Sequence, residues 1–533
     1  MGALAAIGRL IDAPIGVVAP GWAAARARAR LVLQVRRVQQ QFLSTYAAAD
    51  KKRTSADWTS KTLSADQAGI GDAVTMTNRA RTAARDHWAA DSIGRAYRRH
   101  VVGIGITPRA AARDPDTGKE LTEFNQAADR LWYAWARRPA WCDVEGRKSL
   151  TEIQGLIVEE LVNAGEAFVL PVYARAGDHV GLAVQLIEPE QLDLSKTRDA
   201  ATGNEIRGGV EITPQGRPVA YHVYTAAHPL EKWSIKSTRI SAERIHHVFR
   251  QRRVRQTRGV TALASVLVKL RHAQMYDEYM LVRARLEACI GLIVTQDLGI
   301  GELDLSLKGP SGDTGQDANA NEEINFEPGM VHRLRPGENV AFQNPTTPGG
   351  EYSPFTRAQY GQIAAGVGLD YATVSRDFSQ GNYSSQRQGL IETWGETDPI
   401  QALLRDTVLT PIRDEFVTLA IVEGRLDAPG FLSDPAWADA YLACDWQPPP
   451  KPWIDPARQA AAIKIALEQR LTTRRAELNR LGEDVREVLR QTADEQALAD
   501  ELGVRLPEAG GGAKVAPVEP RPTKAPPGEP EEK

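Results

Sequence analysis

The sequence predicts an α+β protein made of several regions rather than one compact core. Its 533 residues exceed the ~150 residues of a typical domain several-fold. Helical patterns fill both halves of the chain, whereas residues 166–249 hold short alternating or apolar runs separated by Gly, Pro and Asp, the pattern of β-strands. After this β-rich stretch a helical pattern runs from about 260 to 288, which at ~1.5 Å per residue predicts a helix ~40 Å long.

The composition is that of a folded protein without a membrane span. Hydrophobic residues make up 42% and charged residues 25% of the chain, both ordinary for a globular protein. No apolar run approaches the ~20 residues that cross a bilayer, and the short apolar stretch 11–20 precedes its arginines, the reverse of a secretory signal. The cysteines are far apart and odd in number, which predicts neither a disulfide framework nor a zinc site and fits a reducing cytoplasm: Cys142, Cys289 and Cys444.

The charge balance argues against a protein that coats nucleic acid. The 65 basic and 68 acidic residues leave a net charge of −3, and neutralising phosphates requires a basic excess. One dense basic patch interrupts this balance, with five arginines in nine residues: Arg250, Arg252, Arg253, Arg255 and Arg258. Such a patch can bind either nucleic-acid phosphates or acidic groups of an adjacent subunit or partner protein. The second interpretation is favoured, because the patch lacks aromatic residues for base stacking.

Helices dominate the first 165 residues. Ala, Arg and Gln with spaced apolar residues over 23–53 predict a basic amphipathic helix, either an arm that packs on a neighbour or a solvated helix. Further helices are predicted over 78–100, 121–137 and 150–164, the second with Trp132 and Trp135 buried. The β-branched residues and glycines of 101–108 predict a short strand after the first of these three helices.

The second half contains short strands and then mainly helices. Strands are predicted at 290–297, 330–334 and 339–343, with a flexible Gly-, Asp- and Asn-rich excursion at 308–321. Capping residues and prolines mark helix starts at Ser353-Pro354, Pro411, Asp455-Pro456 and Thr472-Thr473. The predicted helices end near Gly366 or Gly368, Leu404, Glu423, Gln469 and Leu502. The tail 507–533 is rich in Pro, Gly, Glu and Lys and is predicted to be disordered, because it has little to bury.

Residues 368–394 form the most informative stretch, a polar loop framed by two helices. The loop carries Arg376, Asp377, Gln380, Asn382 and Tyr383 but no His, no Cys and no pair of carboxylates. Ser384 or Ser385 is expected to cap the following helix. Arg387 is expected to reach back to Asp377 or Asp370 as a charge-assisted clamp. An ordinary surface loop between helices fits these features equally well.

Catalytic and nucleotide-binding motifs are absent from the sequence. There is no G-x-x-x-x-G-K-[ST], no H-E-x-x-H and no G-x-S-x-G, and Gly103-x-Gly105 lacks the third glycine of a dinucleotide site. His246 and His247 are neighbours on a predicted strand and point to opposite faces, so they are not expected to share a metal. Glu159 and Glu160 diverge on a predicted helix. The sequence therefore predicts no catalytic, cofactor or metal site and no enzymatic activity.

Several motifs recur together in the order of one known family. The segment 368–394 contains Val374-Ser375-Arg376-Asp377-Phe378-Ser379, Tyr383-Ser384-Ser385-Gln386-Arg387 and Glu392-Thr393-Trp394. Supporting motifs are Ala19-Pro20-Gly21-Trp22 followed by arginines, the run from Val101 to Pro108, Glu327-Pro328-Gly329 and Asp455-Pro456. With these motifs the chain resembles, over almost its full length, the lambda-type family of bacteriophage portal proteins. Val374 stands where that family more commonly has Leu.

The resemblance implies a subunit of a ring-shaped homo-oligomer, typically a dodecamer, at one vertex of a capsid. A separate motor, the terminase with its large subunit, packs double-stranded DNA through such a ring, and the DNA later leaves through it. The resemblance also implies docking to major capsid and scaffold proteins and to a head-completion or adaptor protein. No cofactor and no membrane partner are implied, and the expected location is the virion, with the host cytoplasm during assembly.

The resemblance further suggests wing, stem, clip and helical crown regions. The expected ranges are 1–110 for the N-terminal arm and start of the wing, 111–165 for the helical wing or first stem region, 166–258 for the β-rich clip-like region, 259–289 for the long stem helix, 290–425 for the wing and channel-side segment, 426–506 for the crown and 507–533 for the disordered tail. Small polar residues in the channel-side segment are hypothesised to lie near DNA: Gln380, Asn382, Tyr383, Ser384 and Ser385.

Two other functions compete with this interpretation. A soluble enzyme with an unrecognised site in the 368–394 loop would be a compact monomer or small oligomer and would lose its activity on Asp377→Asn. A head-tail adaptor ring is disfavoured by length, because such connectors are usually much smaller.

Overall fold

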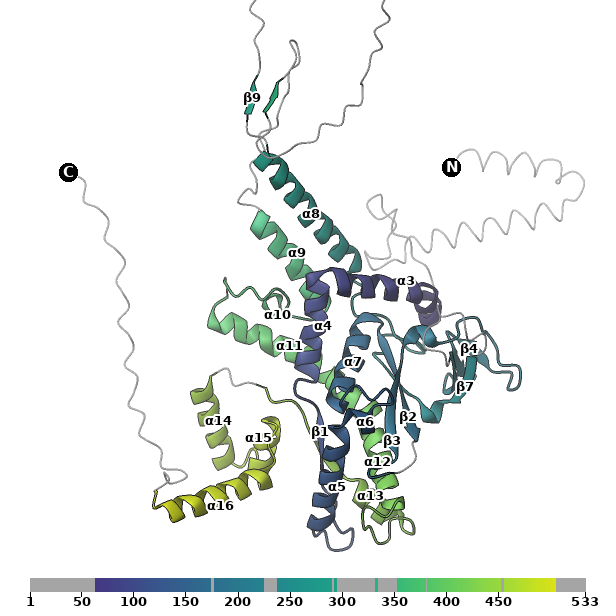
Figure 1. Ribbon diagram of the computed structural model, residues 1–533, viewed down its shortest axis with the longest axis vertical. Helices are drawn as coiled ribbons and strands as arrows, with labels where there is room; N and C mark the ends of the chain where they lie inside the picture. The colour runs from purple at the N-terminus through teal and green to yellow at the C-terminus, as the bar shows by residue number, and fades with distance from the viewer. Residues whose placement is uncertain are drawn as a thin grey trace, which may run out of the picture. The chain divides into compact units, whose positions relative to one another are not determined.

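The computed structural model describes residues 63–173, 177–224, 237–289, 292–294, 331–333, 352–379, 381–451 and 455–504 (Figure 1). The chain divides into two compact units, 1–64 and 65–533, and all of the helices and strands described below belong to the second. Several predictions lie outside the described residues: the helix at 23–53, the excursion at 308–321, the strand at 339–343, Gln380, the tail 507–533 and the motifs at 19–22 and 327–329. Among the described helices, none is both long and apolar enough to cross a membrane.

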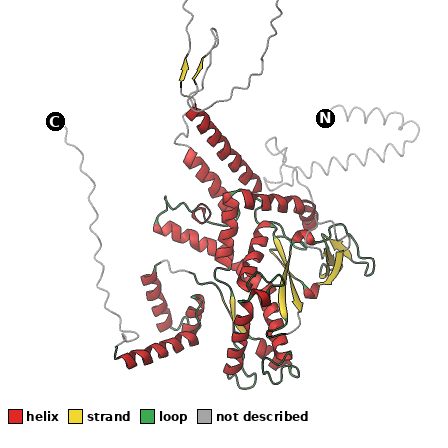
Figure 2. Cartoon of the chain, viewed as in Figure 1, coloured by secondary structure: helices red, strands yellow, loops and turns green. Residues whose placement is uncertain are grey.

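Helices and strands are both present, as predicted, and helices predominate (Figure 2). The α-helices are α3 (Ala65–Asp86), α4 (Trp88–Val101), α5 (Thr122–Ala136), α6 (Pro139–Cys142), α7 (Leu150–Asn163), α8 (Leu267–Cys289), α9 (Tyr352–Gly366), α10 (Tyr371–Ser375), α11 (Tyr383–Leu404), α12 (Thr410–Val422), α13 (Pro435–Leu442), α14 (Pro456–Glu468), α15 (Arg474–Arg480) and α16 (Val485–Leu502). Two 3₁₀ turns, η3 (Pro189–Gln191) and η4 (Ala242–Arg244), and one π-helical segment, η5 (Arg405–Leu409), complete the helical elements of the described chain.

The β-rich stretch predicted at 166–249 is confirmed and forms two antiparallel sheets. One has the order β3-β2-β8, from β2 (Glu166–Tyr173), β3 (Leu182–Ile187) and β8 (His246–Phe249). The other has the order β4-β5-β6-β7, from β4 (Glu205–Arg207), β5 (Val210–Ile212), β6 (Pro218–Tyr224) and β7 (Ser237–Ser241). Their apolar side chains share a small core of their own that includes Phe168, Leu192, Tyr221 and Val223. This region therefore has packing of its own within the larger unit.

Two further strand pairs join distant parts of the chain. β1 (Thr107–Ala110) pairs antiparallel with β11 (Cys444–Gln447), and β9 (Leu292–Val294) pairs parallel with β10 (Val331–Arg333). The strand predicted at 101–108 thus begins later than expected, because α4 continues to Val101 and a turn follows it.

An aromatic cluster within the main core links helices to the first sheet. Trp132 and Trp135 of α5 are buried, as predicted, and pack against Phe416 of α12 with ring centroids 5.2 Å and 5.0 Å away. The indole N–H of Trp135 donates to the carbonyl oxygen of Leu182 in β3 at 2.7 Å. This hydrogen bond satisfies the polar atom of a buried tryptophan and fixes α5 against the sheet.

Helix boundaries follow capping rules where the caps are local. Ser149 and Glu152 form a capping box that starts α7, and Asp455 and Thr473 cap α14 and α15 as predicted. The single helix predicted over 78–100 is wrong, because the chain breaks at His87, whose Nδ1 accepts from the amide of Ala89 and caps α4.

The long helix is shorter than predicted. α8 begins at Leu267 rather than near 260 and has 23 residues, so it extends ~35 Å. The preceding turns are tied to α7, because the hydroxyl of Thr261 and the amide of Ala262 both donate to the carbonyl oxygen of Val162. α8 pairs with α9 through Asp277, whose carboxylate accepts from the hydroxyls of Tyr352 and Tyr360 at 3.1 Å and 2.6 Å.

α11 ends at Leu404, as predicted, but the chain does not leave the helical conformation there. α11 passes without a break into η5 and then α12, so the chain stays helical from Tyr383 to Val422. Pro399 lies inside α11. π-Helical segments such as η5 are rare, occur mostly inside longer α-helices and are frequent at functional sites.

Candidate functional site

The polar segment 368–394 folds into α10, a short loop and the first half of α11. Asp370 caps α10 by accepting from the amide of Ala372 at 2.8 Å. The loop begins at Arg376, which has a left-handed φ of 59°. α10 and α11 approach closely at Gly389, where an added Cβ would lie 2.6 Å from the side chain of Asp370. The segment therefore joins two helices, and their close approach requires a residue without a side chain at position 389.

The cap of α11 differs from the one predicted. Asn382, and neither Ser384 nor Ser385, is the N-cap, and its side-chain oxygen accepts from the amide of Ser385 at 2.8 Å. The hydroxyl of Ser385 accepts in return from the amide of Asn382 at 3.1 Å. Ser385 takes part as the third helical residue of a capping box, a role that Glu or Gln more often fills.

The predicted clamp by Arg387 does not form among the described residues. Arg387 is exposed, and Asp377 instead accepts from the amide of Ser379 at 2.9 Å and from the hydroxyl of Tyr371 at 3.4 Å. The cation near Asp377 is Arg357 of α9, whose guanidinium lies 5.1 Å from the ring centre of Tyr371. Hydrogen bonds from Ser379, with a smaller contribution from the charge of Arg357, lower the pKa of Asp377.

The residues predicted to lie near DNA are accessible in the isolated chain. Asn382, Ser384 and Ser385 are exposed, and Tyr383 is 51% exposed, whereas Gln380 lies outside the described residues. Phe378 is exposed beside them and was missed, although one large apolar side chain in an otherwise polar loop was a signal for it. Contact of these residues with a ligand remains a prediction.

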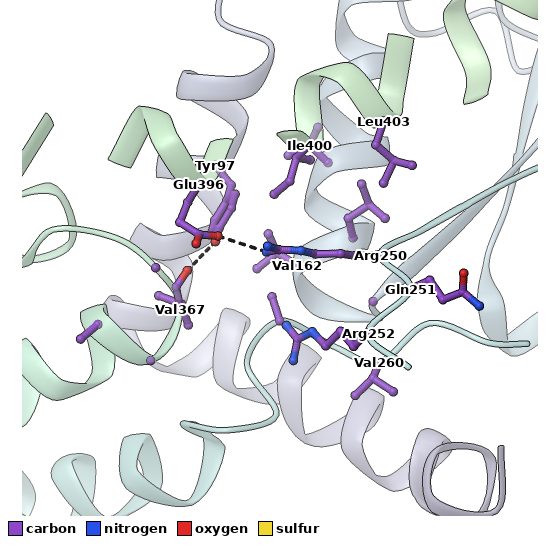
Figure 3. Close-up of a pocket in the computed structure, with 17 residues that line it drawn as sticks. Tyr97, Val162, Arg250, Gln251, Arg252, Val260, Val367, Glu396, Ile400 and Leu403 are labelled. Carbon is purple, nitrogen blue, oxygen red and sulfur yellow. Dashed lines mark hydrogen bonds and ion pairs between the residues drawn. The ribbon is translucent and has the colours of Figure 1, made fainter. Parts of the chain in front are cut away.

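A pocket of about 540 Å³ lies next to this segment and brings together the two regions singled out in the sequence (Figure 3). Gly368 and Glu396 line it from the helical segment, and Arg250 and Arg252 line it from the arginine patch. Apolar side chains of α7 and α11 complete the wall, among them Val158, Leu161, Val162, Ile400 and Leu403.

One ion pair crosses the pocket. Nη1 of Arg250 lies 3.1 Å from Oε2 of Glu396, and both side chains are about half exposed (Figure 3). The hydroxyl of Tyr97 donates to the carbonyl oxygen of Val367 at 2.5 Å. Burial, with the nearby charge of Glu396, raises the pKa of Tyr97 to about 12, so this phenol stays protonated at neutral pH. The pocket thus has one paired carboxylate and a hydrogen-bonded phenol, and its lining contains no histidine, cysteine or second carboxylate.

The arginine patch divides into buried and exposed members. Arg258, which the sequence grouped with the partner-contacting arginines, is buried and pairs with Glu166, the first residue of β2, at 2.6 Å. It also donates to the carbonyl oxygens of Gly208 and Pro189. Assigning Arg258 to an external contact is therefore wrong, because its guanidinium is enclosed and already satisfied within the chain.

The other arginines of the patch remain accessible. Arg252, Arg253 and Arg255 are exposed, and Arg255 has a left-handed φ of 64° while donating to the carbonyl oxygen of Pro214 at 3.0 Å. The amides of Arg252 and Arg253 both donate to the side-chain oxygen of Gln256, which holds the turn.

Glu166 is the centre of a buried polar cluster that sequence reasoning missed. Besides Arg258, its carboxylate accepts from Nε2 of His247 at 2.9 Å and from the amide of Gly259 at 2.7 Å. Burial alone would raise the pKa of Glu166, but the charge of Arg258 and the hydrogen bond from His247 outweigh burial and hold that pKa at about 2. Burial lowers the pKa of His247. His246 and His247 occupy different environments, as predicted, since only His247 touches Glu166.

A second cluster, in which Glu211 and His222 are buried and Asp199 is half-buried, has the residue types of a metal centre. Asp199, Glu211 and His222 bring ligand atoms within 4.8 Å of one another. Arg239 already donates to Glu211 from two nitrogens, at 2.8 Å and 3.2 Å. Nζ of Lys196 lies 3.2 Å from Nδ1 of His222, whereas Nε2 of His222 lies 3.5 Å from Glu211 and has no hydrogen-bond partner among the described residues. Arg239 and Lys196 therefore bring two positive charges against this cluster, which disfavours a further cation there.

The family match and the relatives in sequence point to one family. Residues 51–401 match the family described as phage portal protein, lambda family. The chain is 26% identical over 484 residues to a protein of Halomonas phage phiHAP-1 named "Probable portal protein", covering 89% of this chain and 90% of that one. It is 22% identical over 475 residues to portal protein B of Escherichia phage lambda, covering 84% and 88%. Among solved structures, it is similar to a chain in the neck of an empty GTA particle, with 13% identity, a TM-score of 0.36 and coverage of 77% and 93%.

Two arginines of one patch are expected to differ sharply in their effect on stability. Arg258→Met leaves Glu166 buried without its cation and should lower the free energy of unfolding by about 3–5 kcal/mol. Arg250→Met removes a half-exposed ion pair and should cost less than about 1 kcal/mol. Urea unfolding followed by circular dichroism measures both. Equal losses for the two variants would contradict the assignment of Arg258 to a buried pair.

The Glu166 cluster predicts a loss of stability in acid. The folded pKa of about 2 lies below the ordinary glutamate value of 4.5, so the pair contributes fully above pH 4.5 and its contribution fades as the pH falls toward 2. The difference corresponds to about 3 kcal/mol. The free energies of unfolding of the wild type and of Glu166→Gln should therefore be measured between pH 3 and pH 6. The difference between the two should become smaller as the pH falls.

The matched control for this pH series is Glu159→Gln, which removes a surface pair with Arg98 at 3.0 Å. The free energy of unfolding of this variant should lie within about 1 kcal/mol of that of the wild type at each pH. If the difference in the free energy of unfolding between the wild type and Glu166→Gln is the same at every pH, the lowered pKa of the Glu166 carboxylate is contradicted.

Proposed function

This chain belongs to the lambda family of phage portal proteins, and from that membership we propose that its copies form a ring whose channel passes double-stranded DNA at one capsid vertex. DNA would enter through this ring during packaging and leave through it during ejection. The family match over 51–401 is the observation that carries the proposal. The charges of the described residues support a structural role, because the carboxylates of the pocket in Figure 3 and of the Glu166 cluster are each paired with an arginine.

The regions of the chain receive roles on the same basis. We assign the β-rich region 166–258 to the clip that faces the terminase, α8 to the stem and residues 426–506 to the crown. The far half of α8 supports a contact with neighbours, since most side chains between Glu278 and Arg285 are exposed, including Tyr279 and Leu281. Major capsid, scaffold and head-completion proteins are the proposed partners of the remaining outer surface.

The exposed loop of the channel-side segment is proposed to face the DNA. Asn382, Tyr383, Ser384 and Ser385 present small or polar groups without a net positive charge, which allows DNA to slide because no phosphate is held tightly. Arg252, Arg253 and Arg255 are proposed to meet acidic groups of a partner protein.

Electron microscopy of the purified full chain tests the portal proposal directly. The expected particles are rings with a central hole, because portal subunits assemble around a channel. Compact particles without a channel under several salt conditions would contradict the proposal. The competing enzyme hypothesis predicts such compact particles, together with an activity that Asp377→Asn abolishes.

A photo-cross-linking residue at Tyr383 tests the position of the loop. In DNA-filled particles that contain this variant, irradiation should link the subunit to DNA, because the side chain is 51% exposed in the single chain. The same variant in unfilled particles is the control and should give no DNA adduct. DNA-filled particles that give no adduct would contradict the proposal that the loop lies on the channel surface.

A further inference from the structure

The three C-terminal helices carry apolar side chains that the described chain does not cover. α14 and α15 have no buried residue, and α16 has only Ala499. Leu471 is 80% exposed and Leu502 is 67% exposed, the latter in the last turn of α16. Helices of this length gain most of their stability from packing of an apolar face. We therefore expect another protein surface to pack against the exposed apolar side chains of these three helices.

α16 combines its exposed leucines with acidic residues on one face. Leu498 and Leu502 are four residues apart and lie one above the other. Asp494, Glu495 and Glu501 lie within about 60° of Leu498 around the helix, at ~100° per residue. We call this set the acidic face. From 491 to 504 the chain contains four carboxylates and no basic residue.

α14, α15 and the turn between them present the opposite charge. Residues 456–482 contain six basic and two acidic side chains. Lys464, Arg470 and Arg474 are exposed, beside the exposed apolar residues Ile465 and Leu471. These five residues are called the basic face. Within the described part of the chain, neither the three cations of this face nor the three carboxylates of the acidic face form an ion pair.

One charge of each face occupies the less favourable end of its helix. Glu501 lies in the last turn of α16, which has no basic residue, and a helix C-terminus disfavours anions. Arg474 is the first residue of α15, and a helix N-terminus disfavours cations. An opposite charge placed against each end would relieve both conflicts.

The turn that carries the basic face is strained as well. Arg470 has a left-handed φ of 55°, a conformation that residues other than glycine rarely adopt. The amides of Arg470 and Leu471 donate to Leu467 and Ala466, which close the end of α14. The backbone thus holds the exposed side chains of Arg470 and Leu471 next to each other in the turn between α14 and α15.

We propose that the acidic face of one copy docks on the basic face of the next copy. This inference rests on the proposed portal function and names one surface that joins neighbouring subunits. A second copy fits because each chain carries both complementary faces and leaves both exposed. Two different surfaces that meet head to tail generate a closed ring when the rotation between copies is constant. DNA is disfavoured as the occupant of the acidic face, because carboxylates repel phosphates.

Charge reversal in the full chain tests this contact. Variant A carries Asp494→Lys, Glu495→Lys and Glu501→Lys, and variant B carries Lys464→Glu, Arg470→Glu and Arg474→Glu. Each variant alone should form at least tenfold fewer rings than the wild type in mass photometry and electron microscopy, since like charges then meet at every contact. An equimolar mixture of A and B should recover rings to within about twofold, because alternating copies restore opposite charges.

The control variant reverses three exposed acids outside these helices, with Asp116→Lys, Asp178→Lys and Asp439→Lys, and should assemble like the wild type. Circular dichroism of A and B should match the wild type. If wild-type rings form and A and B assemble as well as the wild type, the docking contact is overturned while the portal function stands. If A and B fail and their mixture fails too, the pairing of these two faces is overturned. Absence of wild-type rings would overturn both proposals.

Discussion

The buried pair between Glu166 and Arg258 is the interaction on which the arrangement of this subunit depends. Glu166 begins β2 directly after α7, Arg258 lies in the loop that leads to α8, and His247 lies in β8. One carboxylate therefore connects strands β2 and β8 to the loop that leads to the long helix. Because a buried charge without its partner costs several kcal/mol, these elements can separate only at a large energetic cost.

The backbone segments on either side of this pair pack so closely that two glycines between them have no space for a side chain. Gly165 has a φ of 90°, and a Cβ there would lie 2.1 Å from the carbonyl carbon of Val260. Gly259, whose amide donates to Glu166, has the carbonyl oxygen of Gly165 equally close to its own Cβ position. The loop between β8 and α8 is thus fixed at its far end, while its near end carries Arg250 across the pocket to Glu396. The same loop that anchors α8 also forms one wall of the pocket.

The sequence predicted features that depend on neighbouring residues and missed those that depend on distant ones. Asp455 and the pair Thr472-Thr473 were identified as helix starts because each stands directly before a helical pattern. Asn382 was missed because Ser384 and Ser385, within three residues of it, are also good caps. The five arginines of 250–258 look alike in sequence, and only Glu166, 92 residues before Arg258, decides which of them is buried. The break at His87 was hidden because histidine is rarely a cap. The family, in contrast, could be identified from several short motifs in order, which need no knowledge of contacts.

Two kinds of ion pair then have different consequences for a ring. A buried pair such as Glu166–Arg258 is shielded from solvent and is little affected by salt, so it suits a joint that must keep one shape inside every copy. Charges on exposed helix faces are screened within about 8 Å at physiological ionic strength, so a contact between copies that uses them weakens as salt rises. If the acidic and basic faces join neighbouring copies, salt should separate subunits before it unfolds them. The near-neutral balance of 65 basic and 68 acidic residues is consistent with this division, because charges that pair within or between copies leave little excess for DNA to bind.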